Sequence, residues 1–156
     1  MNAPFRTIAL AGRFQTEGVA ASIAAIGDFL RQRGIAVLLE KNTADAIGRP
    51  GDAADTEHIG HEADLAIAIG GDGTMLGLAR ELAPYEVPLV GINHGRLGFI
   101  TDIGIESWQE ALGSILDGHY LAEERTLLTA RVVRDQEIVW NALALNDVVV
   151  NRSSRM

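Results

Sequence analysis

One carboxylate stands in a glycine-rich run between an expected strand and an expected helix. Residues 70–74 read Gly-Gly-Asp-Gly-Thr, after the apolar residues 65–69 and before the helical pattern of residues 75–82. Glycine lets a bulky ligand approach the backbone, and the N–H groups and dipole of a helix start favour phosphate. Asp72 in such a turn can accept a proton from a substrate hydroxyl, orient that hydroxyl or hold a magnesium ion. All three roles belong to phosphoryl transfer, which is the chemistry that this run predicts.

Four short apolar runs read as buried strands, and helical patterns lie between them. The runs are residues 7–11, 35–39, 65–69 and 89–92. Apolar strands that alternate with helices form right-handed β-α-β units, with a parallel sheet covered on both faces. The fold class predicted for this part of the chain is therefore α/β, a Rossmann-like parallel sheet with flanking helices.

The first helical pattern has a clear apolar face and a clear end. Val19, Ile23, Ile26 and Leu30 follow one another at spacings of four, three and four residues, and Gly34 is placed to end the helix.

Two further segments carry local predictions. Ser107 and Glu110 are spaced as a capping box, which predicts a helix that Gly118 closes. The polar residues 40–61 are rich in Asp, Gly and Ala, and we expect a loop there with room for one short helix.

The pattern changes in the last part of the chain. Residues 126–134 and 137–151 are two extended runs with no helix between them, which predicts an antiparallel hairpin. We therefore expect an α/β domain over residues 1–122, followed over residues 123–156 by the start of an all-β second domain that is incomplete here.

Composition and charge exclude several classes of function. The chain has 156 residues, is 47% hydrophobic and 22% charged, and carries a formal net charge of −8. That charge argues against nonspecific binding to nucleic acid or to an anionic membrane. The chain has no cysteine, which excludes disulfides, thiolate metal sites and a cysteine nucleophile. We see neither a membrane-spanning run nor a signal peptide, and we expect a cytoplasmic protein.

Three motifs carry a resemblance to a known family. Residues 70–74 resemble the signature of a kinase superfamily that holds NAD kinases, diacylglycerol and sphingosine kinases and, more distantly, phosphofructokinases. Residues 91–102, Gly-Ile-Asn-His-Gly-Arg-Leu-Gly-Phe-Ile-Thr-Asp, resemble the bacterial NAD kinase pattern. Asn146-Asp147 resembles the Asn-Glu/Asp motif with which NAD kinases bind the dinucleotide. The chain therefore resembles the N-terminal half of a bacterial NAD kinase.

The resemblance implies a reaction and a set of site residues. NAD kinases transfer a phosphoryl group from ATP, or in some members polyphosphate, to the 2′-hydroxyl of the adenosine ribose of NAD, giving NADP. A divalent metal, expected to be Mg²⁺, assists. By motif, Asp72 is the proton acceptor, Asp72 and Gly73 line the NAD site, and Asn146 and Asp147 reach it from the second domain. No residue of this chain is assigned as a metal ligand, and the full-length form is expected to be a homo-oligomer.

Some positions depart from the family pattern or are weaker candidates. Gly77 stands where many members carry Arg or His, and the family's second domain continues well beyond this chain. His94 could contact a phosphate, and the alternative is a solvated loop histidine. Arg96 could also bind a phosphate, and the alternative is an ion pair on the surface. Phe99 could line the nucleotide pocket, but a place in the hydrophobic core is the favoured reading.

Two alternatives from other classes stay open. The chain could be a non-catalytic fragment that binds a nucleotide or a full-length subunit. It could also be a lipid kinase, which residues 70–74 alone would allow. The motif at residues 91–102 and the lack of a basic amphipathic segment disfavour that second reading.

Overall fold

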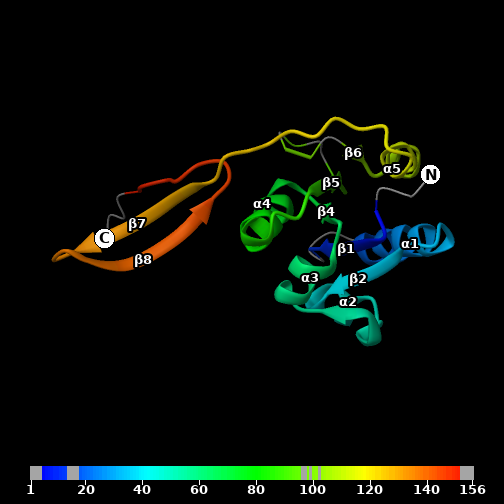
Figure 1. Ribbon diagram of the computed structural model, residues 1–156, viewed down its shortest axis with the longest axis horizontal. Helices are drawn as coiled ribbons and strands as arrows, with labels where there is room; N and C mark the ends of the chain where they lie inside the picture. Colours follow the sequence, from blue (N-terminus) through cyan, green and yellow to red (C-terminus); the bar gives the residue numbers. More distant parts are fainter. Residues whose placement is uncertain (1–4, 14–17, 96–97, 99, 102, 152–156) are drawn as a thin grey trace. The chain divides into compact units, whose positions relative to one another are not determined.

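The computed structural model describes residues 5–13, 18–95, 98, 100–101 and 103–151. The chain divides into two compact units, Met1–Leu121 and Ala122–Met156, and each has its own sheet (Figure 1). The assignment of the second unit to a β-rich NAD-binding domain stays a prediction.

The sheet of the first unit has six parallel strands within the described residues, in the order β3-β2-β1-β4-β5-β6. The strands are β1 Thr7–Gly12, β2 Ala36–Glu40, β3 Ala53–Ala54, β4 Leu65–Gly70, β5 Leu89–Asn93 and β6 Ile103–Gly104. The predicted α/β class with a parallel sheet is confirmed. The sequence pattern did not indicate the two-residue strands β3 and β6, because a run that short carries no periodicity.

Helices cover both faces of this sheet (Figure 1). They are α1 Val19–Gln32, α2 Lys41–Ala46, α3 Thr56–Glu62, α4 Asp72–Leu82 and α5 Trp108–Leu116, with 3₁₀ turns η1 Pro50–Asp52 and η2 Ala83–Tyr85. The helices α1 and α5 pack on one face, and α3 and α4 pack on the other. None of the helices in the described part of the chain is long and apolar enough to cross a membrane.

Side-chain size differs between the two faces of the central strands. On β1, Ile8 and Leu10 enter the core beneath α1, whereas Ala9 and Ala11 enter the core beneath α4. β4 repeats this alternation of large and small side chains. Successive side chains of a strand point to opposite faces, so the alanines of both strands all face α4. Because these side chains are small, α4 can approach the sheet closely.

Residues 40–61 were predicted as a loop with room for one short helix, but the segment forms two helices, α2 and α3. Acidic side chains cap both of them. Glu40 Oε1 accepts from the Asn42 N–H at 2.9 Å, and Asp55 Oδ1 accepts from the His58 N–H at 2.8 Å. Such bonds satisfy N–H groups that would otherwise lack a partner in the first turn of a helix.

The predicted capping box before α5 was also wrong, although the helix itself is present. Ser107 is the N-cap residue, but its hydroxyl donates to the Gly104 carbonyl at 3.2 Å and makes no cap bond. β6 ends only three residues earlier, so the hydroxyl closes a turn after that strand. Gly118 follows α5 with φ +86° and Gly34 follows α1 with φ +77°, and both helices end as predicted.

The second unit contains the predicted antiparallel hairpin of β7 Leu128–Arg134 and β8 Glu137–Ala144. Asp135 and Gln136 join the strands with φ values of 49° and 67°, as a tight turn with two left-handed residues requires. The prediction that the second strand extends to residue 151 was wrong. β7 begins at Leu128, opposite Ala144, so residues beyond Ala144 have no partner strand among the described residues.

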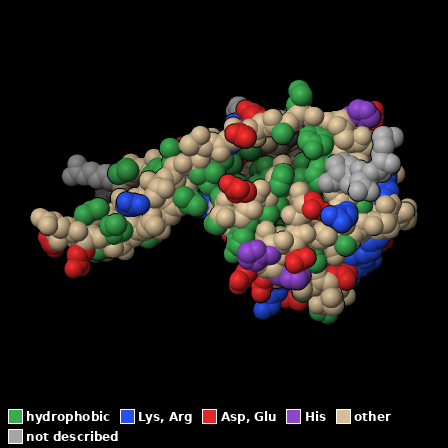
Figure 2. All heavy atoms as spheres, in the orientation of Figure 1, with side chains coloured by type: hydrophobic (Ala, Val, Ile, Leu, Met, Phe, Trp, Pro, Cys, Tyr) green, Lys and Arg blue, Asp and Glu red, His purple; other side chains and the backbone are tan. Residues whose placement is uncertain are grey.

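The hairpin exposes large apolar side chains. Figure 2 shows hydrophobic side chains on the surface of this unit, and Trp140, Ile138 and Val139 are each more than half exposed, at 52%, 57% and 54%. A two-stranded hairpin with apolar side chains in water is marginally stable at best by itself.

Candidate functional site

The site lies where the sheet reverses its winding. β1 and β4 are neighbours, and the helices that follow them, α1 and α4, cover opposite faces of the sheet. Their carboxyl ends therefore flank the crevice in which open α/β sheets bind ligands. The register pairs Gly12 with Ile69, and Gly70 with Asn93, so the ends of β1, β4 and β5 lie side by side.

The Gly-Gly-Asp-Gly-Thr run forms the link from β4 to α4. Gly70 has φ +155°, and a Cβ there would lie 2.5 Å from Thr74 Oγ1, so only glycine fits. Gly71 is the N-cap residue, and its carbonyl accepts from the Thr74 and Met75 N–H groups at 2.9 and 3.2 Å.

The start of this helix differs from the prediction. We expected Asp72 in the turn before a helix at residue 75, but the helix begins at Asp72 itself. The carboxylate therefore lies in the first turn of α4, where the helix dipole favours negative charge.

The loop after β5 holds the Asp72 carboxylate. Asp72 Oδ1 accepts from the N–H groups of Ile100 and Thr101, both at 3.3 Å, and from the Thr101 hydroxyl at 3.1 Å. The Asp72 side chain is half-buried, and Thr101 is buried. In the sequence this loop served only as a family marker, and its contact with Asp72 was not predicted. The signal was a threonine directly after residues 97–100, which are apolar or glycine.

The backbone of Gly98 lies close to the same carboxylate. An ideal Cβ on Gly98 would overlap the Asp72 side chain and would lie 2.6 Å from Oδ2. The close approach of the loop backbone to Asp72 therefore requires glycine at this position.

A cavity of about 550 Å³ opens beside the start of α4. The end of β1 contributes Gly12 and Arg13, the start of α2 contributes Asn42, and α4 contributes Gly73 and Gly77. Gly77, where the family pattern has Arg or His, adds no side chain to the cavity. The volume lies in the range typical of pockets for small molecules and cofactors.

Within the described ranges, no group of three or more His, Asp or Glu side chains could hold a metal ion. Glu40 lines the cavity, but its carboxylate already accepts four hydrogen bonds from Asn42 and Thr43. Mg²⁺ that binds through nucleotide phosphates, water and one or two carboxylates would need no such group of protein ligands.

The other expected site residues lie in different places. Gly73 is exposed and lines the cavity. Asn146 and Asp147 follow β8 in the second unit, and both are exposed. The roles of these three residues in binding stay predictions.

The weaker candidates follow β5 in the sequence. His94 Nε2 lies 3.1 Å from Ser22 Oγ on α1, and the His94 N–H donates to the Gly70 carbonyl at 2.7 Å. The ring therefore contacts a helix of the first unit. Arg96 and Phe99 lie outside the described residues.

The chain is similar in sequence to known bacterial proteins. The model of the ATP-NAD kinase N-terminal domain matches residues 22–120. A protein of Burkholderia thailandensis named NAD kinase is 54% identical over 150 residues, which are 96% of this chain and 50% of that protein. The NAD kinase of Cupriavidus pinatubonensis is 50% identical over 154 residues, again half of its length. The chain thus spans about half the length of the curated relatives that it matches.

The fold is similar to that of a solved kinase. The structure of yeast NADH kinase complexed with NADH aligns with a TM-score of 0.77 over 93% of this chain and 50% of that one. The sequence identity of 16% is low, so this likeness concerns the fold alone.

Proposed function

Because the chain belongs to the ATP-NAD kinase family and corresponds to the N-terminal half of its bacterial members, we propose that the full-length protein phosphorylates NAD. It transfers a phosphoryl group from ATP to the 2′-hydroxyl of the adenosine ribose, and the products are NADP and ADP. The observation that carries this proposal is the position of Asp72, a carboxylate in the first turn of α4 at the carboxyl edge of the sheet.

Asp72 supplies the proton acceptor. The ribose 2′-oxygen forms a bond to the γ-phosphorus, the bond from that phosphorus to the bridging oxygen of ADP breaks, and the hydroxyl proton passes to Asp72. A ribose hydroxyl is a poor nucleophile. A carboxylate within about 3 Å of the hydroxyl orients it and accepts its proton, which accelerates the reaction. Positioning and charge neutralisation supply most of the remaining rate in phosphoryl transfer.

The cavity beside α4 suits the phosphate donor. Gly73 in the first turn of α4 and Arg13 after β1 line it, and both can bind phosphate. Glu40 and Glu81 line it as well, so a bound phosphate would need a cation beside it. A divalent metal bound with ATP would neutralise charge on the phosphates.

Other parts of the assignment come from the family resemblance. Asn146 and Asp147 bind the dinucleotide from the second unit. Polyphosphate as donor, a homo-oligomeric full-length form and a cytoplasmic location stay predictions.

The test is the variant Asp72→Asn in a fusion protein that joins this chain to the part of the Burkholderia thailandensis relative that it does not cover. Removing the proton acceptor should lower kcat for NADP formation by about 10²- to 10⁴-fold. NAD affinity, measured by calorimetry, should change by less than about threefold, because the amide has the shape of the carboxylate.

The matched control is Asp117→Asn, at an exposed aspartate after α5 that pairs with Arg33 at 3.7 Å. This control should keep the parental kcat. Near-parental NADP formation by the Asp72→Asn fusion would remove Asp72 from the reaction and defeat the proposed mechanism.

The second candidate is that the 156-residue chain binds a nucleotide without turning it over. The 156-residue chain should be assayed alone. Sustained NADP formation that Asp72→Asn abolishes would eliminate this candidate.

A further inference from the structure

Asp72 accepts from a chain of hydrogen bonds that begins in the loop after β5. The Gly95 N–H donates to Asn93 Oδ1 at 2.9 Å, and Asn93 Nδ2 donates to Thr101 Oγ1 at 2.9 Å. The Thr101 hydroxyl then donates to Asp72 Oδ1 at 3.1 Å. Asn93 and Thr101 are 3% and 1% exposed, so two buried polar side chains connect the loop backbone to the carboxylate.

The Gly95 N–H fixes the direction of these bonds. An N–H group can only donate, so the Asn93 atom beside it is the carbonyl oxygen, and the amide nitrogen faces Thr101. Thr101 Oγ1 accepts from that amide, and its single proton is left to donate to Asp72. The network therefore presents a fixed donor to the carboxylate.

Packing fixes the Thr101 side chain in the orientation that this bond needs. A Cβ on Gly91 of β5 would lie 2.5 Å from Thr101 Cγ2, so the threonine methyl group packs against bare backbone. A β-branched side chain has few χ1 rotamers, and placing its methyl group also places its hydroxyl. The N–H groups of Ile100 and Thr101 reach the same Asp72 oxygen.

We propose that Thr101 is a positioning residue that fixes the Asp72 carboxylate for proton transfer, and that Asn93 supports it by orienting the Thr101 hydroxyl. This inference rests on the proposed function, because it states how the reacting group of that function is held. The physical reason is that a displacement of about 1 Å at a reacting group can lower the rate by about 10²-fold.

The first test is Thr101→Val in the fusion protein, a change that keeps the shape and removes the hydroxyl. We expect kcat for NADP formation to fall by about 10- to 100-fold, while KM for NAD stays within about threefold. Thr101→Ser keeps the hydroxyl and should restore kcat to within about threefold of the parent. An unchanged kcat in Thr101→Val would overturn the proposal.

A double-variant comparison separates positioning from plain structural support. Thr43 is the matched control, because it is also buried and its hydroxyl also bridges two groups, the Gly12 N–H and Glu40 Oε2, each at 3.0 Å. In the Asp72→Asn background, Thr101→Val should cause no further loss of the residual kcat. Thr43→Val should have the same fold-effect in both backgrounds. An equal loss from Thr101→Val in both backgrounds would show that Thr101 does not act through Asp72.

A measurement on this chain alone does not depend on activity. NMR couplings between Hα and Hβ of Asp72 should report one χ1 rotamer in the parent chain and in Thr101→Ser, and averaged rotamers in Thr101→Val. A single Asp72 rotamer in Thr101→Val would contradict the positioning role. If the parent fusion makes no NADP, the proposed function fails, and the rotamer measurement still decides the role of Thr101.

Discussion

At the scale of single residues, the site depends on what contacts Asp72. Its carboxylate lies in the first turn of α4 and accepts hydrogen bonds from two loop N–H groups and one hydroxyl. Gly98 lies against the same carboxylate with no side chain between them. The loop after β5 is therefore part of the site, although Thr101 lies 29 residues after Asp72 in the sequence.

The variant Gly98→Ala tests this close contact. The new methyl group would overlap the Asp72 carboxylate, so we expect the carboxylate or the loop to move and kcat of the fusion protein to fall by about 10-fold or more. The fold should persist, because Gly98 lies in a loop and belongs to neither hydrophobic core.

The control for that variant is Gly51→Ala, at a glycine where an added Cβ would meet no atom within 4 Å. Steady-state kinetics together with thermal unfolding give the comparison. Parental kcat in Gly98→Ala would mean that the loop does not press on Asp72 in the active protein.

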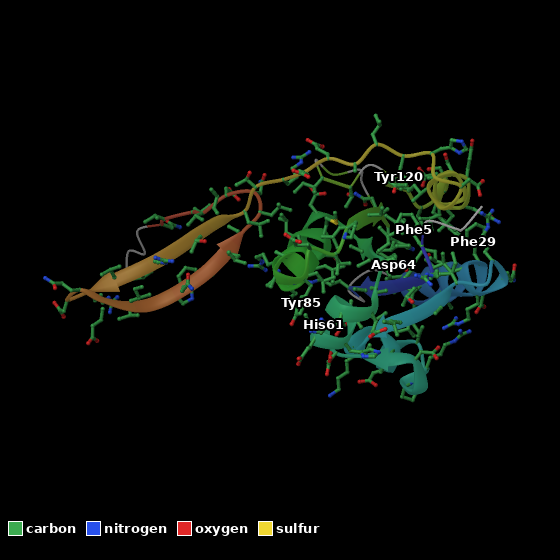
Figure 3. The ribbon with its side chains drawn as sticks, viewed as in Figure 1. Phe5, Phe29, His61, Asp64, Tyr85 and Tyr120 are labelled. Atoms are coloured by element: carbon green, nitrogen blue, oxygen red, sulfur yellow. The ribbon has the colours of Figure 1, made fainter. Side chains whose placement is uncertain are left out.

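At the scale of elements, one carboxylate ties the starts of two central strands together. Asp64, labelled in Figure 3, lies immediately before β4. Its Oδ2 accepts from the N–H groups of Arg6 and Thr7 at 2.7 and 2.9 Å. The Asp64 N–H donates to the Thr7 carbonyl at 2.9 Å. These bonds from the Arg6 and Thr7 N–H groups, helped by the positive charge of Arg6, lower the pKa of Asp64 from its ordinary value of 3.8.

This lowered pKa predicts a dependence of stability on pH. The folded state binds the Asp64 proton more weakly than the unfolded chain, so the stabilisation is fully present above the unfolded pKa of 3.8. It is lost as the pH falls through the lower pKa of the folded state. Asp64→Asn should therefore be less stable than the parent at pH 6, and the difference should shrink towards pH 3.

Urea unfolding of the parent chain and of Asp64→Asn between pH 6 and pH 3 measures that difference. A difference in unfolding free energy that stays constant across this range, or grows as the pH falls, would contradict the assigned role of the Asp64 bonds.

At the scale of the whole molecule, the two units differ in how much apolar surface they bury. The first unit has two hydrophobic cores, one on each face of its sheet. The hairpin of the second unit leaves Trp140 and several branched apolar side chains more than one-third exposed. Most of the stability of this chain should therefore come from the first unit.

Truncation of the chain to residues 1–121 tests this division. Because the hairpin buries little apolar surface, the shortened chain should keep a cooperative thermal transition with a midpoint within a few degrees of the parent, measured by calorimetry. The parent should bind more of the dye ANS than the shortened chain, because it carries the exposed apolar hairpin. Loss of the cooperative transition on truncation would show that the first unit depends on residues 122–156.

The sequence by itself was sufficient for the features that depend on local order along the chain. The alternation of apolar strands and helices predicted the parallel sheet, and Gly34 and Gly118 marked the ends of α1 and α5. The motif at residues 70–74 indicated the kinase family. These features are readable because periodicity and left-handed turns are properties of neighbouring residues.

Only the tertiary structure decided which distant groups surround Asp72. The parallel register of β4 and β5 pairs Gly70 with Asn93, and this pairing brings the loop after β5 to the start of α4. Thr101 and Gly98 could not be assigned to the carboxylate beforehand, because strand register is set by the packing of the whole sheet. Residues 40–61 were predicted to hold at most one short helix, and the two helices capped by Glu40 and Asp55 were not foreseen for a related reason. A polar side chain favours a helix start only where its hydrogen-bond partner is the helix backbone, and the sequence does not show that partner.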